Sequence, residues 1–540
     1  MQAHNSSVSL YKAQNQLIFM KLQINNTFSK ELPADKNLEN SRRQVTDACF
    51  SYVTPKKTEN PEVLHVSDEM LNELGISKEE SSSSDFLHVF TGNTVYQDTH
   101  PYAMCYGGHQ FGNWAGQLGD GRAINLFEVN YNNKQWAVQL KGAGETPYSR
   151  SADGLAVLRS SIREYLCSEA MHHLGIPTTR ALSLSLSGDK VLRDVLYNGN
   201  PAYEKGAIVC RTAPNFIRFG SFEIHSARKN NDILKQLADY TISQFYPEIK
   251  SSGKDKYLDF FIEVRNRTID MIIHWQRVGF VHGVMNTDNM SIMGLTIDYG
   301  PYGWLEGYDL SWTPNTTDAQ HRRYRYGNQS YIGLWNLFQL ANALYPLVEE
   351  VDPLQKLLEE YNPIYEEKYL DMMRGKLGLK SAQLNDKEII GKLEETLQLI
   401  ETDMTIFFRS LGQINKTDSN SDAIGKIKEA FYSEIEYKGE TKQHWEDWFK
   451  LYIERLQKET LSDTERLTYM NTINPKYVLR NYMAQLAIDK ADKGEYELIN
   501  ELYTLLKKPY DEQPVFQKWF AKRPEWARNK VGCSMLSCSS

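Results

Sequence analysis

Residues 282–300 read HGVMNTDNMSIMGLTIDYG and combine side chains that could hold a metal ion beside a nucleotide. A His-Gly turn is followed by Asn289, by a short apolar hairpin and by Asp298 in Asp-Tyr-Gly. In kinase-type folds, the amide of such an Asn and the carboxylate of such an Asp converge on Mg2+ bound to nucleotide phosphates. The spacing therefore predicts Asn289 and Asp298 as metal ligands.

One position in this stretch departs from the pattern of a kinase. Val284 lies two residues after His282, where a kinase loop carries its catalytic aspartate. A valine can neither accept a proton nor contact a cation, and the nearest spare carboxylate belongs to Asp288, directly before Asn289. The sequence therefore argues against ordinary phosphoryl transfer.

The elements upstream carry a lysine that could reach nucleotide phosphates. Residues 106–123, YGGHQFGNWAGQLGDGRA, are glycine-rich, as is typical of backbone that turns tightly or approaches a ligand closely. Strands predicted at 123–129 and 135–140 follow, joined by a turn with an Asn-Asn pair. The second strand ends in Lys141, an arrangement by which a kinase aims an ammonium group at phosphates.

A helix predicted at 155–174 follows a second glycine-containing loop and carries Glu164. Glu164 is the natural partner of Lys141, although two such residues could also form a surface ion pair worth little. Arg211 and Arg218 come next, and guanidinium groups suit phosphate oxygens because they can donate two parallel hydrogen bonds.

We predict four parts of the chain: an N-terminal extension over 1–100 and further domains over 101–219, 220–350 and 351–540. Within the extension, the serine run 81–84 is predicted to be a solvated loop. The last of these reads as a helical appendage without a detectable repeat. Apolar residues at spacings of three and four predict helical segments at 232–245, 257–278, 332–348, 393–411 and 477–488.

Composition narrows the classes of function. The net charge of -8 over 540 residues argues against a nucleic-acid binder, which usually presents a basic face. No apolar run is long enough to span a membrane, and the first 19 residues lack the features of a signal or transit peptide, so either Met1 or Met20 could be the start. Six cysteines form neither a disulfide framework nor a zinc pattern. We therefore expect a cytoplasmic protein.

Long blocks of the sequence resemble one family, the selenoprotein O family, known in bacteria as YdiU. They include HQFGNWAGQLGDGRA, LKGAGETPYSR, RFGSFE, HGVMNTDNMSI, TIDYGP and NPKYVLRNYMAQ, and the resemblance extends over about 40–540. It implies an α+β, two-lobed protein-kinase-like fold that binds ATP in a flipped orientation. It also implies transfer of AMP to Ser, Thr or Tyr hydroxyls of proteins with Mg2+ or Mn2+, and some members of the family transfer UMP from UTP.

The resemblance assigns roles to residues of this sequence. Asp288 matches the proton acceptor, Asn289 and Asp298 match the metal ligands, and Glu164 matches the partner of the lysine. The residues that match nucleotide contacts are Gly119, Gly121, Arg122, Lys141, Asp153, Gly154, Arg211, Arg218 and Asp298.

Two departures from the family pattern qualify these expectations. Leu155 stands where many members have an arginine, and the segment SWTPNTTD lacks the cysteine that some members pair with a C-terminal one. Redox control by that bond is therefore not expected, and the roles of Cys533 and Cys538 stay open. Two other functions also stay open: a kinase that transfers the γ-phosphate with Asp288 as a displaced base, and a non-catalytic nucleotide-binding scaffold.

Overall fold

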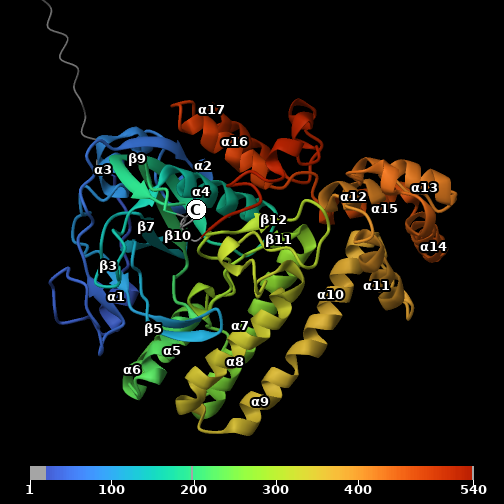
Figure 1. The fold of residues 1–540 in the computed structure, drawn as a ribbon. Helices are drawn as coiled ribbons and strands as arrows, with labels where there is room; N and C mark the ends of the chain where they lie inside the picture. The colour runs from blue at the N-terminus through green and yellow to red at the C-terminus, as the bar shows by residue number, and fades with distance from the viewer. Residues whose placement is uncertain (1–19, 196–198, 538–540) are drawn as a thin grey trace, which may run out of the picture.

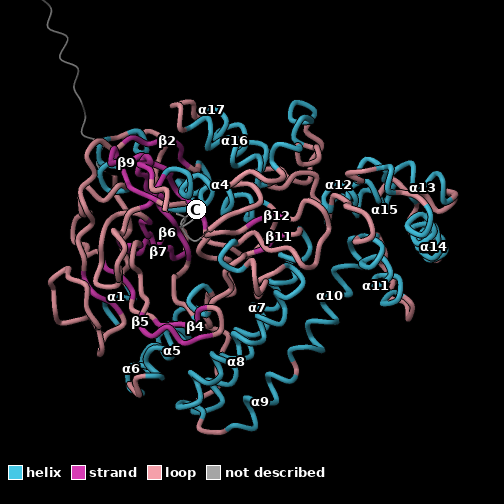
Figure 2. Tube along the Cα trace, in the orientation of Figure 1, coloured by secondary structure: helices cyan, strands magenta, loops and turns pink. Residues whose placement is uncertain are grey.

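The computed structural model describes residues 20–195 and 199–537, so Met1 and Cys538 lie outside it. Strands gather in the part built from the first 213 residues, and helices make up most of the remainder (Figures 1 and 2). The α+β class predicted from the sequence is confirmed. None of the helices in the described part is long and apolar enough to cross a lipid bilayer.

One antiparallel sheet dominates the N-terminal part of the described chain. Its strands follow the order β1-β3-β6-β7-β10-β9-β2, and β8 pairs with β10 off this path. The strand bounds are β1 Phe50–Tyr52, β2 Glu62–Val66, β3 Tyr102–Met104, β6 Ala123–Tyr131, β7 Lys134–Lys141, β8 Ala156–Val157, β9 Arg180–Arg193 and β10 Ala202–Ala213.

The predicted strands at 123–129 and 135–140 are confirmed as β6 and β7. Asn132 and Asn133 both adopt positive φ at the turn between them, which matches the twist of a two-stranded hairpin. Gln139 of β7 lies opposite Arg211 of β10, and Lys141 lies two residues further on. Because side chains alternate along a strand, all three project from one face of the sheet.

Helix α4 (Leu158–His173) packs against β9 and β10. It begins three residues later than predicted, because Ala156 and Val157 extend and pair with β10 instead of starting the helix. Gly175, with φ of +74°, follows its end and provides the left-handed turn that the sequence indicated.

The segment predicted to be an N-terminal extension supplies part of the sheet itself, since β1 and β2 form the two ends of the strand order. It also holds α1 (Thr27–Glu31), α2 (Asp68–Leu74) and α3 (Ser84–Phe90). The serine run 81–84 exposes Ser82 and Ser84, as predicted, but it is not a loop, because it spans the end of a 3-10 turn (Glu80–Ser82) and the start of α3. Ser83 accepts a hydrogen bond from the main-chain N–H of Phe86 at 3.1 Å, so it caps α3, a position that serine favours.

The predicted helices at 232–245, 257–278 and 332–348 are confirmed as α6 (Asn231–Phe245), α7 (Gly253–Val278) and α8 (Gln329–Val348). The hairpin of β4 (Gly107–Gln110) and β5 (Asn113–Gln117) reaches from the sheet and contacts α5 (Phe219–Ala227). Strands β11 (Phe280–Val281) and β12 (Gly303–Trp304) pair with each other and bracket the segment 282–302. The next helices are α9 (Val351–Glu359) and α10 (Tyr361–Leu377).

The C-terminal helices are α11 (Asp386–Leu397), α12 (Met404–Leu411), α13 (Asn420–Ile427), α14 (Gly439–Leu456), α15 (Asp463–Ile473), α16 (Asn481–Ala491) and α17 (Glu497–Leu506). The single helical segment predicted at 393–411 is wrong, because the chain breaks between α11 and α12. Asp403 caps α12 at the main-chain N–H of Ile406 and accepts from the buried Arg480, which fixes this break.

The last helices do not extend away from the molecule as an appendage. Figure 1 shows α16 and α17 lying beside α4, at the sheet end of the structure. Tyr503 Oη donates to Ser67 Oγ at 2.9 Å, and Lys205 Nζ donates to the main-chain oxygen of Ala491 at 3.0 Å. The C-terminal segment therefore helps to hold α4 against the sheet.

Candidate active site

A cavity of about 640 Å³ lies between the sheet and the segment 284–301. All of the residues predicted to contact a nucleotide, a metal or the reacting hydroxyl line this cavity, while Glu164 lies directly behind it. The lining includes Gly119, Gly121, Arg122, Lys141, Asp153, Gly154, Arg211, Arg218, Asp288, Asn289 and Asp298. Residues far apart in the sequence are thus brought together at one place.

Charged side chains form a continuous chain along the wall of the cavity. Lys141 Nζ lies 2.6 Å from Glu164 Oε2, and Arg211 Nη1 donates to Glu164 Oε1 at 2.9 Å. Both side chains of the Lys141–Glu164 pair are at least nine-tenths buried, so this is not a surface ion pair. The pairing predicted from sequence therefore forms, and Glu164 fixes two cations at once.

Asp298 is the second anion of this chain of charges. Its carboxylate accepts from Arg211 Nη1 at 2.6 Å and from Arg218 Nη1. Burial alone would raise the pKa of Asp298, but the guanidinium groups of Arg218 and Arg211 hold this pKa well below its usual range. Asp298 is therefore a carboxylate at any physiological pH, as a metal ligand must be.

Burial lowers the pKa of Lys141 to about 8, against the opposing effect of Glu164. The ammonium form still dominates at neutral pH, because the pKa remains above 7. Lys141 can thus present a positive charge in the cavity, and its charge depends on Glu164.

His282 holds the loop that carries Asp298. Its Nε2 lies 2.9 Å from the main-chain oxygen of Ile297, and its Nδ1 accepts from the main-chain N–H of Val284. Asp298 adopts φ of +55°, a left-handed conformation that Asp tolerates better than most residues. These contacts give His282 a structural role in this loop.

Asp288 lies in the short 3-10 turn Thr287–Asn289, facing the cavity. Burial raises its pKa to about 7, against the hydrogen bond from Gln110. Gln110 Nε2 donates to Asp288 Oδ2 at 3.2 Å, while Asp288 Oδ1 is buried and has no hydrogen-bond partner among the described residues. A carboxylate with a free oxygen and a pKa near neutrality is suited to accept a proton.

The oxygen atoms of this region suit a hard divalent cation. Asn289 Nδ2 donates to the main-chain oxygen of Val284 at 2.9 Å, and the amide oxygen of Asn289 accepts no hydrogen bond within the described residues. Arg218 Nη1 donates both to the main-chain oxygen of Asp288 and to Asp298, so the two carboxylates flank one guanidinium. Amide and carboxylate oxygens are the ligands that Mg2+ and Mn2+ prefer, so the residues present fit such an ion.

The glycines predicted to contact a nucleotide have a second reason to be glycine. A Cβ atom on Gly119 would lie 2.4 Å from the ring of Tyr148, and one on Gly154 would lie 2.1 Å from the main-chain oxygen of Gly144. Both residues also adopt positive φ. The room left by the missing side chains is therefore filled by protein, and these glycines let two loops pack together at the cavity mouth.

Arg122 and Asp153, both predicted to contact the nucleotide, differ in how many hydrogen bonds they make within the protein. Arg122 donates no hydrogen bond within the described residues and is half-buried in the cavity wall. Asp153, in contrast, accepts from Arg193 at 2.7 Å and from the main-chain N–H of Leu155 at 3.0 Å. Its carboxylate positions Arg193, a cavity residue that sequence reasoning missed because β9 carries no motif around it.

Gln110 and Asp120 are further cavity residues that sequence reasoning missed. Asp120 lies between Gly119 and Gly121 and is fully buried 3.7 Å from Arg218 Nη2. Both lie in the glycine-rich stretch 106–123, and this position is the one feature of the sequence that could have indicated them as cavity residues.

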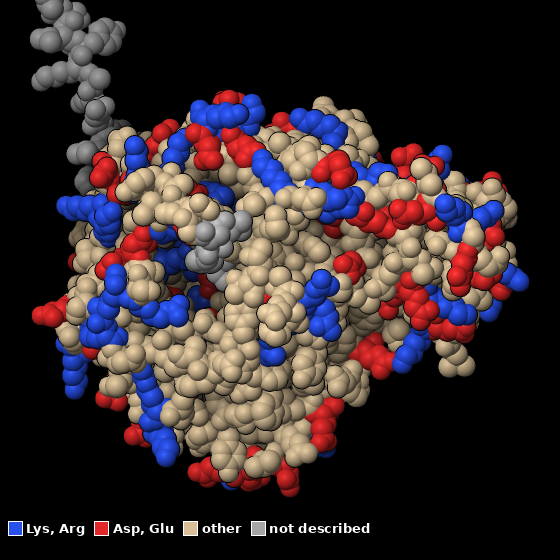
Figure 3. Space-filling view, viewed as in Figure 1, with Lys and Arg blue, Asp and Glu red and all other residues tan. Residues whose placement is uncertain are grey.

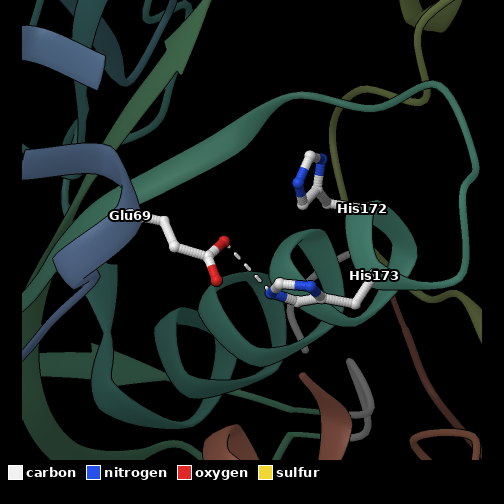
Figure 4. Close-up of side chains that lie close together, drawn as sticks. All are labelled: Glu69, His172 and His173. Atoms are coloured by element: carbon white, nitrogen blue, oxygen red, sulfur yellow. Dashed lines mark ion pairs between the residues drawn. The ribbon is translucent and has the colours of Figure 1, made fainter. Parts of the chain in front are cut away.

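A second group of possible metal ligands lies outside the cavity. Glu69, His172 and His173 place ligand atoms within 4.8 Å of one another, and Figure 4 shows the contact from Glu69 to His173. However, the Glu69 carboxylate already pairs with Arg180 at 3.1 Å and with Lys507 at 3.0 Å. Glu69 is therefore already engaged in ion pairs within the protein.

Comparison with known proteins identifies the family. The model of the SelO family, described as protein adenylyltransferase SelO, matches residues 34–507. Proteins named protein nucleotidyltransferase YdiU are similar over 96% of this chain and 99% of their own length: 64% identity in Flavobacterium johnsoniae, 52% in Rhodopirellula baltica and 50% in Aromatoleum aromaticum. The resemblance seen in the sequence is confirmed, and the chain belongs to the SelO family of protein adenylyltransferases.

Proposed function

We propose that this protein transfers AMP from ATP to Ser, Thr or Tyr hydroxyls of other proteins and releases pyrophosphate. Family membership supports an enzyme of the protein nucleotidyltransferase class. The proposed scaffold is a two-lobed kinase-like fold in which the sheet and the helical part enclose the 640 Å³ cavity. The observation that carries the proposal is Asp288, a cavity carboxylate with a pKa near 7 and one unpartnered oxygen.

In this mechanism the Asp288 carboxylate accepts the proton of the acceptor hydroxyl. The hydroxyl oxygen then forms a bond to the α-phosphorus, and the bond from that phosphorus to the bridging oxygen breaks. Pyrophosphate leaves with the electron pair, so AMP remains on the protein. The valine at 284 cannot take this role, which is why the base must come from elsewhere in the loop.

Asn289 and Asp298 are the residues that would hold Mg2+ or Mn2+, and the ion would neutralise phosphate charge. We assign phosphate contact to Arg122, which donates no hydrogen bond within the described residues, and to Lys141, whose ammonium group lines the cavity beside Glu164. Arg211 has most of its N–H groups committed to Gln139, Glu164 and Asp298, so we assign it to positioning the site and supplying charge. UTP remains a second possible donor.

Labelled ATP distinguishes this function from its alternatives. With α-labelled ATP, label is expected on acceptor protein, and the mass of the product should rise by one AMP. Retention of label only from the γ position would instead support a kinase with Asp288 as its base. Stabilisation by ATP without any modified product, equal in wild type and Asp288→Ala, would support a nucleotide-binding scaffold.

A further inference from the structure

A second cavity, of about 530 Å³, lies on the surface of the helical part, between α8, α9 and the start of α10. We call it the α8–α9 groove. Its walls are mainly apolar and include Tyr331, Trp335, Phe338 and Tyr345 from α8 and Val351 and Leu358 from α9. Nothing in the mechanism above uses this groove.

Helix α8 is apolar on two faces, and only one of them is covered. Leu337, Leu340 and Leu344 belong to the buried core. Tyr331, Phe338 and Tyr345 form a second stripe at spacings of seven, and their side chains are 59%, 49% and 43% exposed. An exposed apolar stripe of this kind is typical of a surface that binds a partner.

One wall of the groove contacts residues that lie next to the candidate active site. Trp335, in the groove wall, lies 5.4 Å from the ring of His109 and 4.7 Å from the guanidinium of Arg323. His109 donates its main-chain N–H to Thr287 Oγ1 at 2.7 Å, and its neighbour Gln110 holds Asp288. A segment bound in the groove would therefore end beside the loop that carries the candidate base.

The border of the groove is acidic. Residues 349–360, which include α9, contain five acidic residues but a single lysine. Glu350 pairs with Lys254 and Glu360 pairs with Arg265, whereas Glu349, Asp352 and Glu359 have no ion-pair partner among the described residues. In Figure 3 the lower part of the molecule, where Figure 1 shows α8 and α9, is a broad area with few charged side chains, bordered below by acidic ones. Complementarity favours a partner segment that carries basic residues beside apolar ones.

From these observations we infer that the α8–α9 groove docks an apolar segment with flanking Lys or Arg residues from the protein that is to be modified. This inference rests on the proposed function and specifies which substrates the same site takes. A concave groove of this volume accommodates the side chains of one short segment, such as the apolar stripe of a helix. A stable contact between two copies of the chain would need a larger surface, of about 800 Å² on each.

The binding test uses synthetic peptides and the full chain. A fluorescent peptide with leucines at i, i+3, i+4 and i+7 and lysines elsewhere is titrated by anisotropy, beside matched peptides in which Ser replaces Leu or Glu replaces Lys. Phe338→Glu and Tyr345→Ser are expected to weaken binding of the Leu/Lys peptide at least tenfold. Ile435→Glu, at a residue that is 80% exposed away from the groove, is the matched control. Binding that is unchanged in Phe338→Glu, or equal for all three peptides, would overturn the inference.

The catalytic test appends the same acceptor tyrosine to the Leu/Lys peptide and to a short peptide without it. In wild type, KM for the long acceptor is expected to be at least tenfold lower than for the short one, and Phe338→Glu should remove this difference. Equal KM values for both acceptors in wild type would refute docking, whereas AMP transfer to neither would refute the proposed function itself. A wild-type dimer that Phe338→Glu makes monomeric in sedimentation would show that a second copy fills the groove, and would also overturn the inference.

Discussion

Replacing Glu164 by Gln removes one anion from between two buried cations. Glu164 lies 2.6 Å from Lys141 and 2.9 Å from Arg211, and it is 3% exposed. At an effective dielectric of about 20, each contact has a gross Coulomb energy on the order of 5 kcal/mol, much of which desolvation of the pair offsets. Breaking such a buried network costs about 3–5 kcal/mol. We therefore expect a clear fall in the free energy of unfolding and at least a tenfold loss of ATP affinity, because both cations lose the group that orients them.

The measurements are thermal unfolding and calorimetric titration with ATP in the presence of Mg2+. Glu69→Gln is the matched control, because Glu69 also bridges an arginine and a lysine but lies outside the cavity and is one-third exposed. For Glu69→Gln we expect the free energy of unfolding to fall by about 0–1 kcal/mol and the ATP affinity to stay unchanged. If folded Glu164→Gln bound ATP as tightly as wild type, the idea that Glu164 positions the cavity cations would be refuted.

Four further outcomes follow from the same contacts. Asp288→Asn should lower AMP transfer about 10²–10⁴-fold, the usual contribution of a general base, while ATP still protects the protein against heat; full activity in this variant would exclude Asp288 as base. Chelation of divalent ions should weaken ATP binding in wild type but have little further effect in Asp298→Asn, as titration with and without chelator can check. Asp403→Ala removes the bidentate partner of the buried Arg480 but leaves Glu306 paired with it, so unfolding should be easier by about 1–3 kcal/mol, and a change in denaturation midpoint near zero would contradict this. Burial lowers the pKa of His225 to about 4, so the unfolded chain binds a proton at a higher pH than the folded chain does. The contribution of His225 to the free energy of unfolding should be fully present above pH 6.5 and should fall by about 3 kcal/mol as the pH drops to 4. Denaturation at a series of pH values should therefore show a smaller fall in His225→Phe.

Local patterns predicted many elements of this fold because their signals lie within a few residues. The hairpin of β6 and β7 was predicted from two strand-like runs joined by an Asn-Asn turn, and α4 was predicted as a helix after a glycine-containing loop. The failed prediction of one helix at 393–411 has a non-local cause. Helical periodicity continues across 398–402, but α11 ends at Leu397, and Asp403, which accepts from the distant Arg480, caps the start of α12.

The chain of charges in the cavity was predicted only in part. Lys141 and Glu164 could be paired in advance, since a strand-end lysine and a helix glutamate have a known relation. Gln110 and Arg193 could not, because their roles depend on which loops fold over the cavity. For the same reason, the sequence could not indicate that the second apolar face of α8 is exposed, because its exposure depends on which segments pack against it.

The sequence by itself determined the family, the identity of the side chains that could do chemistry and the absence of a base at Val284, because these depend on residue types and short spacings. Only the tertiary structure decided the environment of those side chains. Asp288 has a pKa near 7 because the hairpin at Gly108 and Gln110 covers it and excludes water. Segments that are distant in the sequence bury Asp288, and this burial raises its pKa to a value suited to a general base.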